Sequence, residues 1–120
     1  MQILIHADSK IEVSPDLVSA IEERLDDALA RFGAKVMRID VHLADLTGTR
    51  FEVNDKECTL VVRIARLAPM TVSDRAPSSI LAVETAAAKA ARLLDAAQEQ
   101  QIGHPGAATI RKMRAEKPSA

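Results

Sequence analysis

The sequence predicts an α+β sandwich of two layers, in which two helices cover one face of a four-stranded sheet. Three observations predict it. Two segments carry apolar residues at helical spacing, short segments alternate between apolar and polar residues, and Ser-Pro or Pro-Ser signals precede the helical segments. An alternating strand has one covered face and an amphipathic helix has one apolar stripe, so the two kinds of element bury each other. The predicted element order is β-α-β-β-β-α.

Length and composition set the limits of this fold. The 120 residues are enough for one domain, and we expect residues 1–102 to form it. Hydrophobic residues make up 48% of the chain and the aromatic ones are only Phe32 and Phe51, so the core is expected to be aliphatic. A single cysteine excludes an internal disulfide, and the start of the chain lacks a signal peptide, so a cytoplasmic location is expected. No apolar run is long enough to span a membrane.

The first strand and helix are predicted from residues 2–7 and from the segment that follows Ser14-Pro15-Asp16. In that segment Ser14 suits the N-cap, Pro15 the first helical position, and Asp16 the first turn. The predicted buried face of this helix comprises Leu17, Ile21, Leu25, Ala28, Leu29 and Phe32. The opposite face carries Glu22, Glu23, Asp26, Asp27 and Arg31, and Gly33 is expected to follow the helix end.

Three more strands are predicted. In the second, residues Met37, Ile39, Val41 and Leu43 are expected to face the core, with Arg38, Asp40 and His42 on the other face. A polar connection over 45–55 leads to the third strand. Its expected core residues are Cys58, Leu60, Val62 and Ile64. Pro69 ends it, and residues 70–74 form a short fourth strand.

The second helix is predicted to start at Pro77-Ser78-Ser79. Its buried stripe is mostly small: Val83, Ala87, Ala90, Leu94 and Ala97. Small side chains let a helix approach its partner closely. A right-handed β-α-β crossover makes the first two strands parallel if they are neighbours. Residues 103–120 are polar and are expected to form a disordered basic tail.

The search for catalytic chemistry gives no enzyme signature. Cys58 and His42 belong to opposite faces of their strands, so they are not expected to form a dyad. The three histidines are scattered and the four glycines are isolated, so neither a metal site nor a phosphate loop is predicted. We therefore expect a protein without catalytic residues, metal or cofactor, and with Cys58 as a buried core residue.

Basic residues are the candidates for nucleic-acid binding. The main candidates are Arg31 and Lys35 near the end of the first helix, and Lys89 and Arg92 on the second. Further candidates are Arg24, Lys56, Arg111, Lys112 and Arg114. The scarcity of aromatic residues argues against base stacking and excludes a sheet of the RNA-recognition-motif type, which leaves recognition of phosphates and shape in structured RNA. The charge balance opposes strong binding, because residues 1–102 have a net charge of −4 and the tail only +3.

The first 97 residues resemble the family of ribosome hibernation-promoting factors and ribosome-associated translation inhibitors, also called sigma-factor modulation proteins. The similar features are the opening "MQILI", the helix start "SPDL", the "RF" at the helix end, "DKEC" before the third strand, and "AVETAAAKAARLL" in the last helix. The resemblance implies the β-α-β-β-β-α fold. It also implies binding to rRNA of the small ribosomal subunit, occlusion of the mRNA–tRNA channel, and arrest of translation during stress.

Among the residues of this chain, the resemblance carries the rRNA contacts to Arg31, Lys89 and Arg92; Lys56 matches a recurrent position without an assigned contact. Two departures from the family stand out. The first helix is acidic rather than basic, and no C-terminal dimerisation domain is evident, as in a short form of the family. The acidic helix leaves an alternative open: a protein-interaction module on the same fold that has lost ribosome binding.

Overall fold

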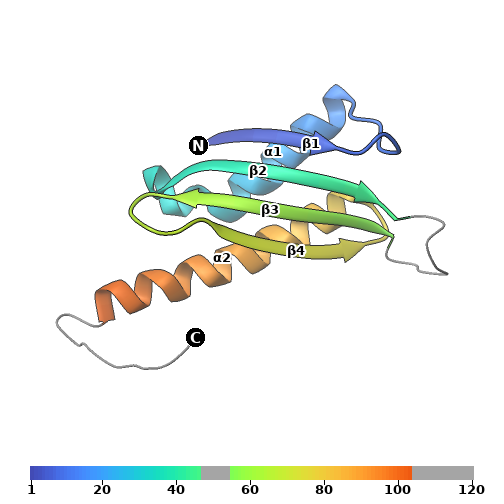
Figure 1. Ribbon diagram of the computed structural model, residues 1–120. Coiled ribbons are helices and arrows are strands. Elements are labelled where there is room, and N and C mark those ends of the chain that lie inside the picture. The colour runs from blue at the N-terminus through green and yellow to red at the C-terminus, as the bar shows by residue number, and fades with distance from the viewer. Residues whose placement is uncertain (47–54, 104–120) are drawn as a thin grey trace.

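The computed structural model describes residues 1–46 and 55–103, with only the backbone of 99–103. Its elements are β1 (Gln2–Ala7), α1 (Pro15–Leu29), the 3-10 helix η1 (Ala30–Lys35), β2 (Val36–Asp45), β3 (Lys56–Ile64), β4 (Met70–Ala76) and α2 (Ser79–Gly103). The strands form one sheet in the order β1-β2-β3-β4. β1 is parallel to β2, the other two pairs are antiparallel, and both helices lie on the same side of the sheet (Figure 1). The predicted α+β fold is confirmed.

The core lies between the sheet and the two helices and is aliphatic, as expected. Its largest fully buried side chains are Ile21, Leu25, Leu29, Ile39, Leu60 and Leu94. On α2 the buried stripe is dominated by alanine, with Ala82, Ala86, Ala87 and Ala90 at 0–1% exposure. Because alanine side chains are small, the backbone of α2 can pack close to the sheet without leaving gaps in the core. Within the described ranges, no helix has the length and hydropathy required to cross a membrane.

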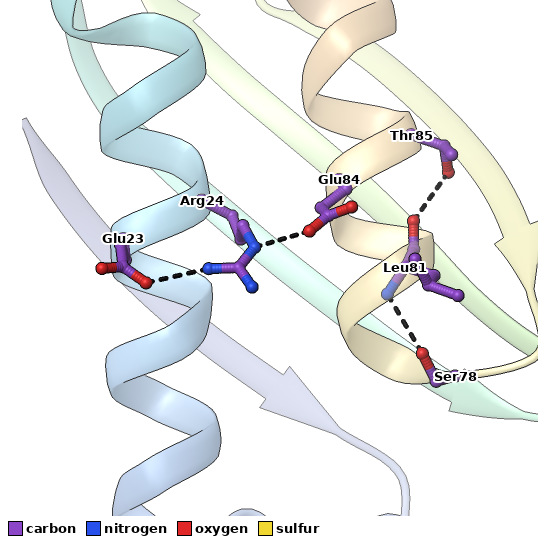
Figure 2. Close-up of polar contacts among 6 residues, drawn as sticks. All are labelled: Glu23, Arg24, Ser78, Leu81, Glu84 and Thr85. Atoms are coloured by element: carbon purple, nitrogen blue, oxygen red, sulfur yellow. Dashed lines mark hydrogen bonds and ion pairs between the residues drawn. The ribbon is translucent and has the colours of Figure 1, made fainter.

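Both predicted helix starts are capped by serine. Ser14 Oγ accepts a hydrogen bond from the Leu17 amide at 3.1 Å, and Pro15 follows at the first helical position. Ser78 Oγ accepts from the Leu81 amide at 3.2 Å (Figure 2). Each cap satisfies an amide that has no partner within its own helix. The sequence signals therefore identify these starts correctly.

The end of the first helix differs from the prediction. α1 ends at Leu29, and η1 continues the chain as a tighter helix that buries Phe32 against the core. Gly33 has φ +58° and ψ −135°, a conformation that costs glycine little and other residues much more. Gly33 thus permits the reversal from the helical layer back into β2.

The prediction for Met37 is wrong. Met37 was expected to face the core with Ile39, but 59% of its surface is exposed. The pairing of β2 with β3 shifts register between Val36 and Arg38, which inserts one extra residue into β2. Val36 and Ile39 therefore both reach the core, and Met37 lies on the bulge between them. From Arg38 onward the alternation follows the prediction.

Candidate nucleic-acid interface

Cys58 lies in the core, away from any catalytic partner. It is fully buried on the helix-facing side of β3, whereas His42 is exposed on the other face of the sheet. Burial, followed by the nearby charges of Asp74 and Glu57, raises the pKa of the Cys58 thiol to about 12. The thiol is therefore protonated at neutral pH and unsuited to nucleophilic attack. In the described part of the chain, no three His, Cys, Asp or Glu side chains gather as a metal site.

We expect Cys58 in the folded protein to resist alkylation by iodoacetamide at pH 8, because only the thiolate reacts and burial disfavours it. Unfolding in guanidinium chloride should restore the reactivity of an ordinary cysteine. Mass spectrometry of the alkylated protein measures both rates. Rapid labelling under native conditions, with no accompanying loss of structure, would contradict the buried, protonated state of Cys58.

Ion pairs between the helices involve two of the candidate RNA-binding arginines. Arg24 Nε of α1 donates to Glu84 of α2 at 2.6 Å, and Arg24 also donates to Glu23 at 2.8 Å (Figure 2). The hydrogen bond with Glu84 is the main cause that raises the Arg24 pKa. Arg31 donates to Asp95 at 2.7 Å and its guanidinium lies 4.6 Å from the centre of the Phe32 ring. Arg24 joins α1 to α2 and Arg31 joins η1 to α2, and a phosphate would have to compete with their carboxylates.

Lys89 also has partners in the fold. It donates to the carbonyl oxygen of Ser73 in β4 at 2.7 Å and lies 3.8 Å from the Asp74 carboxylate. The contact ties α2 to the last strand of the sheet. Although Lys89 and Arg92 are three residues apart on α2, Lys89 is directed to β4. Their charges are therefore not equally available to a ligand.

Lys56 lies at the opposite end of β3 from the turn to β4. Its ammonium donates to Asp55 at 2.9 Å and lies 3.6 Å from Asp45. The hydrogen bond to Asp55 is the main cause that raises the Lys56 pKa, so the ammonium remains charged at neutral pH. Its charge is balanced by two carboxylates at the start of the strand.

Arg92 and Lys35 are the main candidates whose charges remain available. Both are exposed, and in the part of the chain that the structure describes neither forms an ion pair. Arg92 lies one turn before Asp95 on α2, so it is near the Arg31–Asp95 pair that joins η1 to α2. Lys35 lies at the end of η1, which follows α1. We use the name helix-end cluster for three cations on the helical side of the molecule: Arg31 and Lys35 of η1, which follows the end of α1, and Arg92 of α2.

Arg66 adds a cation that the sequence analysis missed. It follows the end of β3 with φ +66°, and it lines a hollow of about 380 Å³ together with Lys35, Leu67, Leu94 and Gln98. In the sequence, Arg66 is marked only as a basic residue between the third strand and Pro69, which does not indicate a binding role. Arg111, Lys112 and Arg114 lie outside the described residues. The RNA-binding role of all these residues remains a prediction.

Comparison with solved structures identifies the fold. A ribosomal subunit interface protein from Coxiella burnetii superimposes with a TM-score of 0.64 at 14% identity, covering 82% of this chain and 98% of that one. The N-terminal domain of Thermus thermophilus Protein Y gives a TM-score of 0.65 at 14% identity, covering 80% and 98%. No family model matches the sequence, and no curated protein matches it. At this identity the likeness establishes the fold that the resemblance implied.

Proposed function

We propose that this protein is a non-catalytic, ribosome-associated translation inhibitor. It binds rRNA of the small subunit in the cytoplasm, occludes the channel of mRNA and tRNA, and keeps idle ribosomes inactive during stress. The observation that carries the proposal is the fold, which is similar to that of a ribosomal subunit interface protein and of Protein Y over at least 80% of the chain. The sequence resemblance to ribosome hibernation factors implies the same function.

The helix-end cluster is the proposed contact with rRNA phosphates. Arg92 and Lys35 are exposed cations without ion-pair partners among the described residues, so binding a phosphate does not require breaking an existing pair. Arg31 is 55% exposed at its side chain and can exchange Asp95 for a phosphate at the same place. These three cations neutralise at most about three phosphates, and the sequence-independent affinity for RNA grows with the number of phosphates neutralised. We therefore expect association with the ribosome to be sensitive to salt.

A second function is favoured by the acidic face of α1. Glu22, Glu23 and Asp26 line a shallow hollow of about 500 Å³ together with Met1 and with Ile3 of β1. Such a surface suits a basic protein segment and repels RNA. In this alternative the chain is a protein-interaction module that has lost ribosome binding. The two functions are distinguished by whether the protein sediments with small subunits.

Co-sedimentation with small ribosomal subunits tests the proposal. The wild-type protein should pellet at low salt and dissociate as the salt concentration rises. Lys35→Glu/Arg92→Glu should pellet weakly, and the slope of log affinity against log salt should become shallower by about two, one for each lost phosphate contact. A wild-type protein that never pellets would contradict the proposed function and favour the alternative.

The matched control is a single charge reversal away from the cluster. Lys10 is exposed between β1 and α1, and its side chain has no ion pair among the described residues. Lys10→Glu changes the net charge by two units, as the single variant Arg92→Glu also does, so comparing these two single variants separates the effect of overall charge from that of the cluster. Equal losses from both substitutions would show that binding does not involve the helix-end cluster.

A further inference from the structure

Two histidines are stacked on the face of the sheet that the helices leave uncovered. His6 of β1 and His42 of β2 are register partners, with ring centres 4.7 Å apart and ring planes inclined by 13°. This separation equals the usual spacing of neighbouring strands, about 4.8 Å, so the rings stack across the strands. His42 is exposed, as is 51% of the His6 side chain. One face of the His6 ring is therefore covered by His42, and the other is directed to the β1 edge.

A buried carboxylate holds this pair in place. Asp40 is 7% exposed, although it lies on the uncovered face of the sheet. It accepts two hydrogen bonds from Arg38, at 3.0 and 3.1 Å, and its Oδ1 lies 3.2 Å from His6 Nε2. The Arg38 hydrogen bonds are the largest cause of the lowered Asp40 pKa. A charged, fully partnered Asp40 therefore orients the His6 ring, so a ligand meets a ring that is already ordered.

The same face carries excess positive charge. Arg63 of β3 is the register partner of Arg38, it is exposed, and no carboxylate pairs with it in the described ranges. Arg38 is already paired with Asp40. Two guanidinium groups thus adjoin a single carboxylate, which leaves a positive charge even with both imidazoles neutral. We call His6, Arg38, Asp40, His42 and Arg63 the sheet surface.

We propose that the sheet surface binds an unpaired strand of RNA, with one base stacked on the outer face of His6 and the backbone phosphates at Arg63. Unstacked bases bind planar side chains, histidine included, and guanidinium groups bind phosphates. Arg63 lies four residues along the strands from His6, about 13 Å at 3.3 Å per residue, and two strands across the sheet, about 10 Å at 4.8 Å per strand. One nucleotide is too short to contact both, so the ligand is a strand.

The choice of RNA over DNA rests on the proposed function; the chemistry of the surface does not distinguish them. Phe, Tyr and Trp are scarce in this chain, but the imidazole ring of histidine is also planar and can stack on a base. The structure supplies a planar surface from two histidines that are 36 residues apart in the sequence and adjacent in the sheet. This surface is opposite to the helix-end cluster, so RNA could contact both faces of the molecule.

Fluorescence anisotropy of a labelled short oligouridine, titrated with the full chain at low salt, tests the proposal without ribosomes. His6→Gln/His42→Gln should lower the affinity roughly tenfold, because it removes the ring on which a base stacks. Glutamine at position 6 can still hydrogen-bond to Asp40, so the fold should be retained, as circular dichroism checks. Arg63→Glu, at an exposed position, should weaken binding as well, and the control Lys10→Glu should leave it unchanged within about twofold.

The results separate this proposal from the proposed function. It is overturned if the wild-type protein does not bind oligouridine, if the histidine variant binds as tightly as wild type, or if Lys10→Glu loses as much affinity as Arg63→Glu. It is overturned as well if a duplex of the same length binds as tightly as the single strand. None of these results alters the co-sedimentation test. Conversely, a protein that never pellets with ribosomes but loses oligouridine binding in the histidine variant retains the sheet surface and refutes the ribosomal role.

Discussion

Replacing Leu60 by alanine is expected to lower the free energy of unfolding by about 2–5 kcal/mol, which is the range for a large aliphatic side chain removed from a core. Leu60 is fully buried at the centre of β3, where the sheet contacts the helical layer. The loss combines the transfer of the side chain to water with the cavity that remains. Urea denaturation followed by circular dichroism measures it, with the midpoint as the readout.

Val61→Ala is the matched control for this prediction. Val61 is the next residue of the same strand, but it points to the uncovered face and is only half-buried. Its replacement should cost about 1 kcal/mol or less. Equal losses at the two positions would contradict the assignment of the core to one face of the sheet.

Neutralising two carboxylates is expected to strengthen RNA binding. In Glu84→Gln/Asp95→Asn, Arg24 and Arg31 lose the partners that hold them at 2.6 and 2.7 Å. Arg31 then becomes available to a phosphate near Arg92, while Arg24 keeps only its ion pair with Glu23. The slope of log affinity against log salt should become steeper by about one to two, one for each arginine that gains a phosphate contact. Co-sedimentation with small ribosomal subunits across a salt series measures it.

The control for this variant is Glu22→Gln/Asp26→Asn. It also removes two negative charges, but from exposed residues of α1 that form no ion pair among the described residues. A general reduction of acidity would raise affinity equally in both variants. Only release of Arg24 and Arg31 predicts a larger effect for Glu84→Gln/Asp95→Asn, and equal effects would contradict it.

The element order could be predicted because each element is encoded by its own residues. The caps at Ser14 and Ser78 are local, and the strand alternation placed Cys58 in the core and His42 outside it before any contact was known. The alternation failed at Met37, because a bulge depends on how β2 pairs with β3. Nothing in the residues around position 37 specifies that pairing.

The candidate site was less predictable because its contacts join distant parts of the chain. Arg24 and Glu84 are 60 residues apart and Arg31 and Asp95 are 64 apart. The sequence therefore showed the cations but not the carboxylates that neutralise them. His6 and His42 were classed as scattered, since their stacking requires the register of two parallel strands. Arg66 became a candidate only when the turn after β3 placed it beside Lys35.

The position of β1 at the edge of the sheet has a consequence for the dynamics of the protein. β1 pairs with β2 alone, and its inward side chains Ile3 and Ile5 are only partly buried. Edge elements with few buried contacts open at a lower free energy than central strands. His6 leaves with β1 in each opening, so the stacked imidazoles exist only in the closed population. A strand of RNA bound to His6 would favour that population, and the amide hydrogens of β1 would then exchange with solvent more slowly.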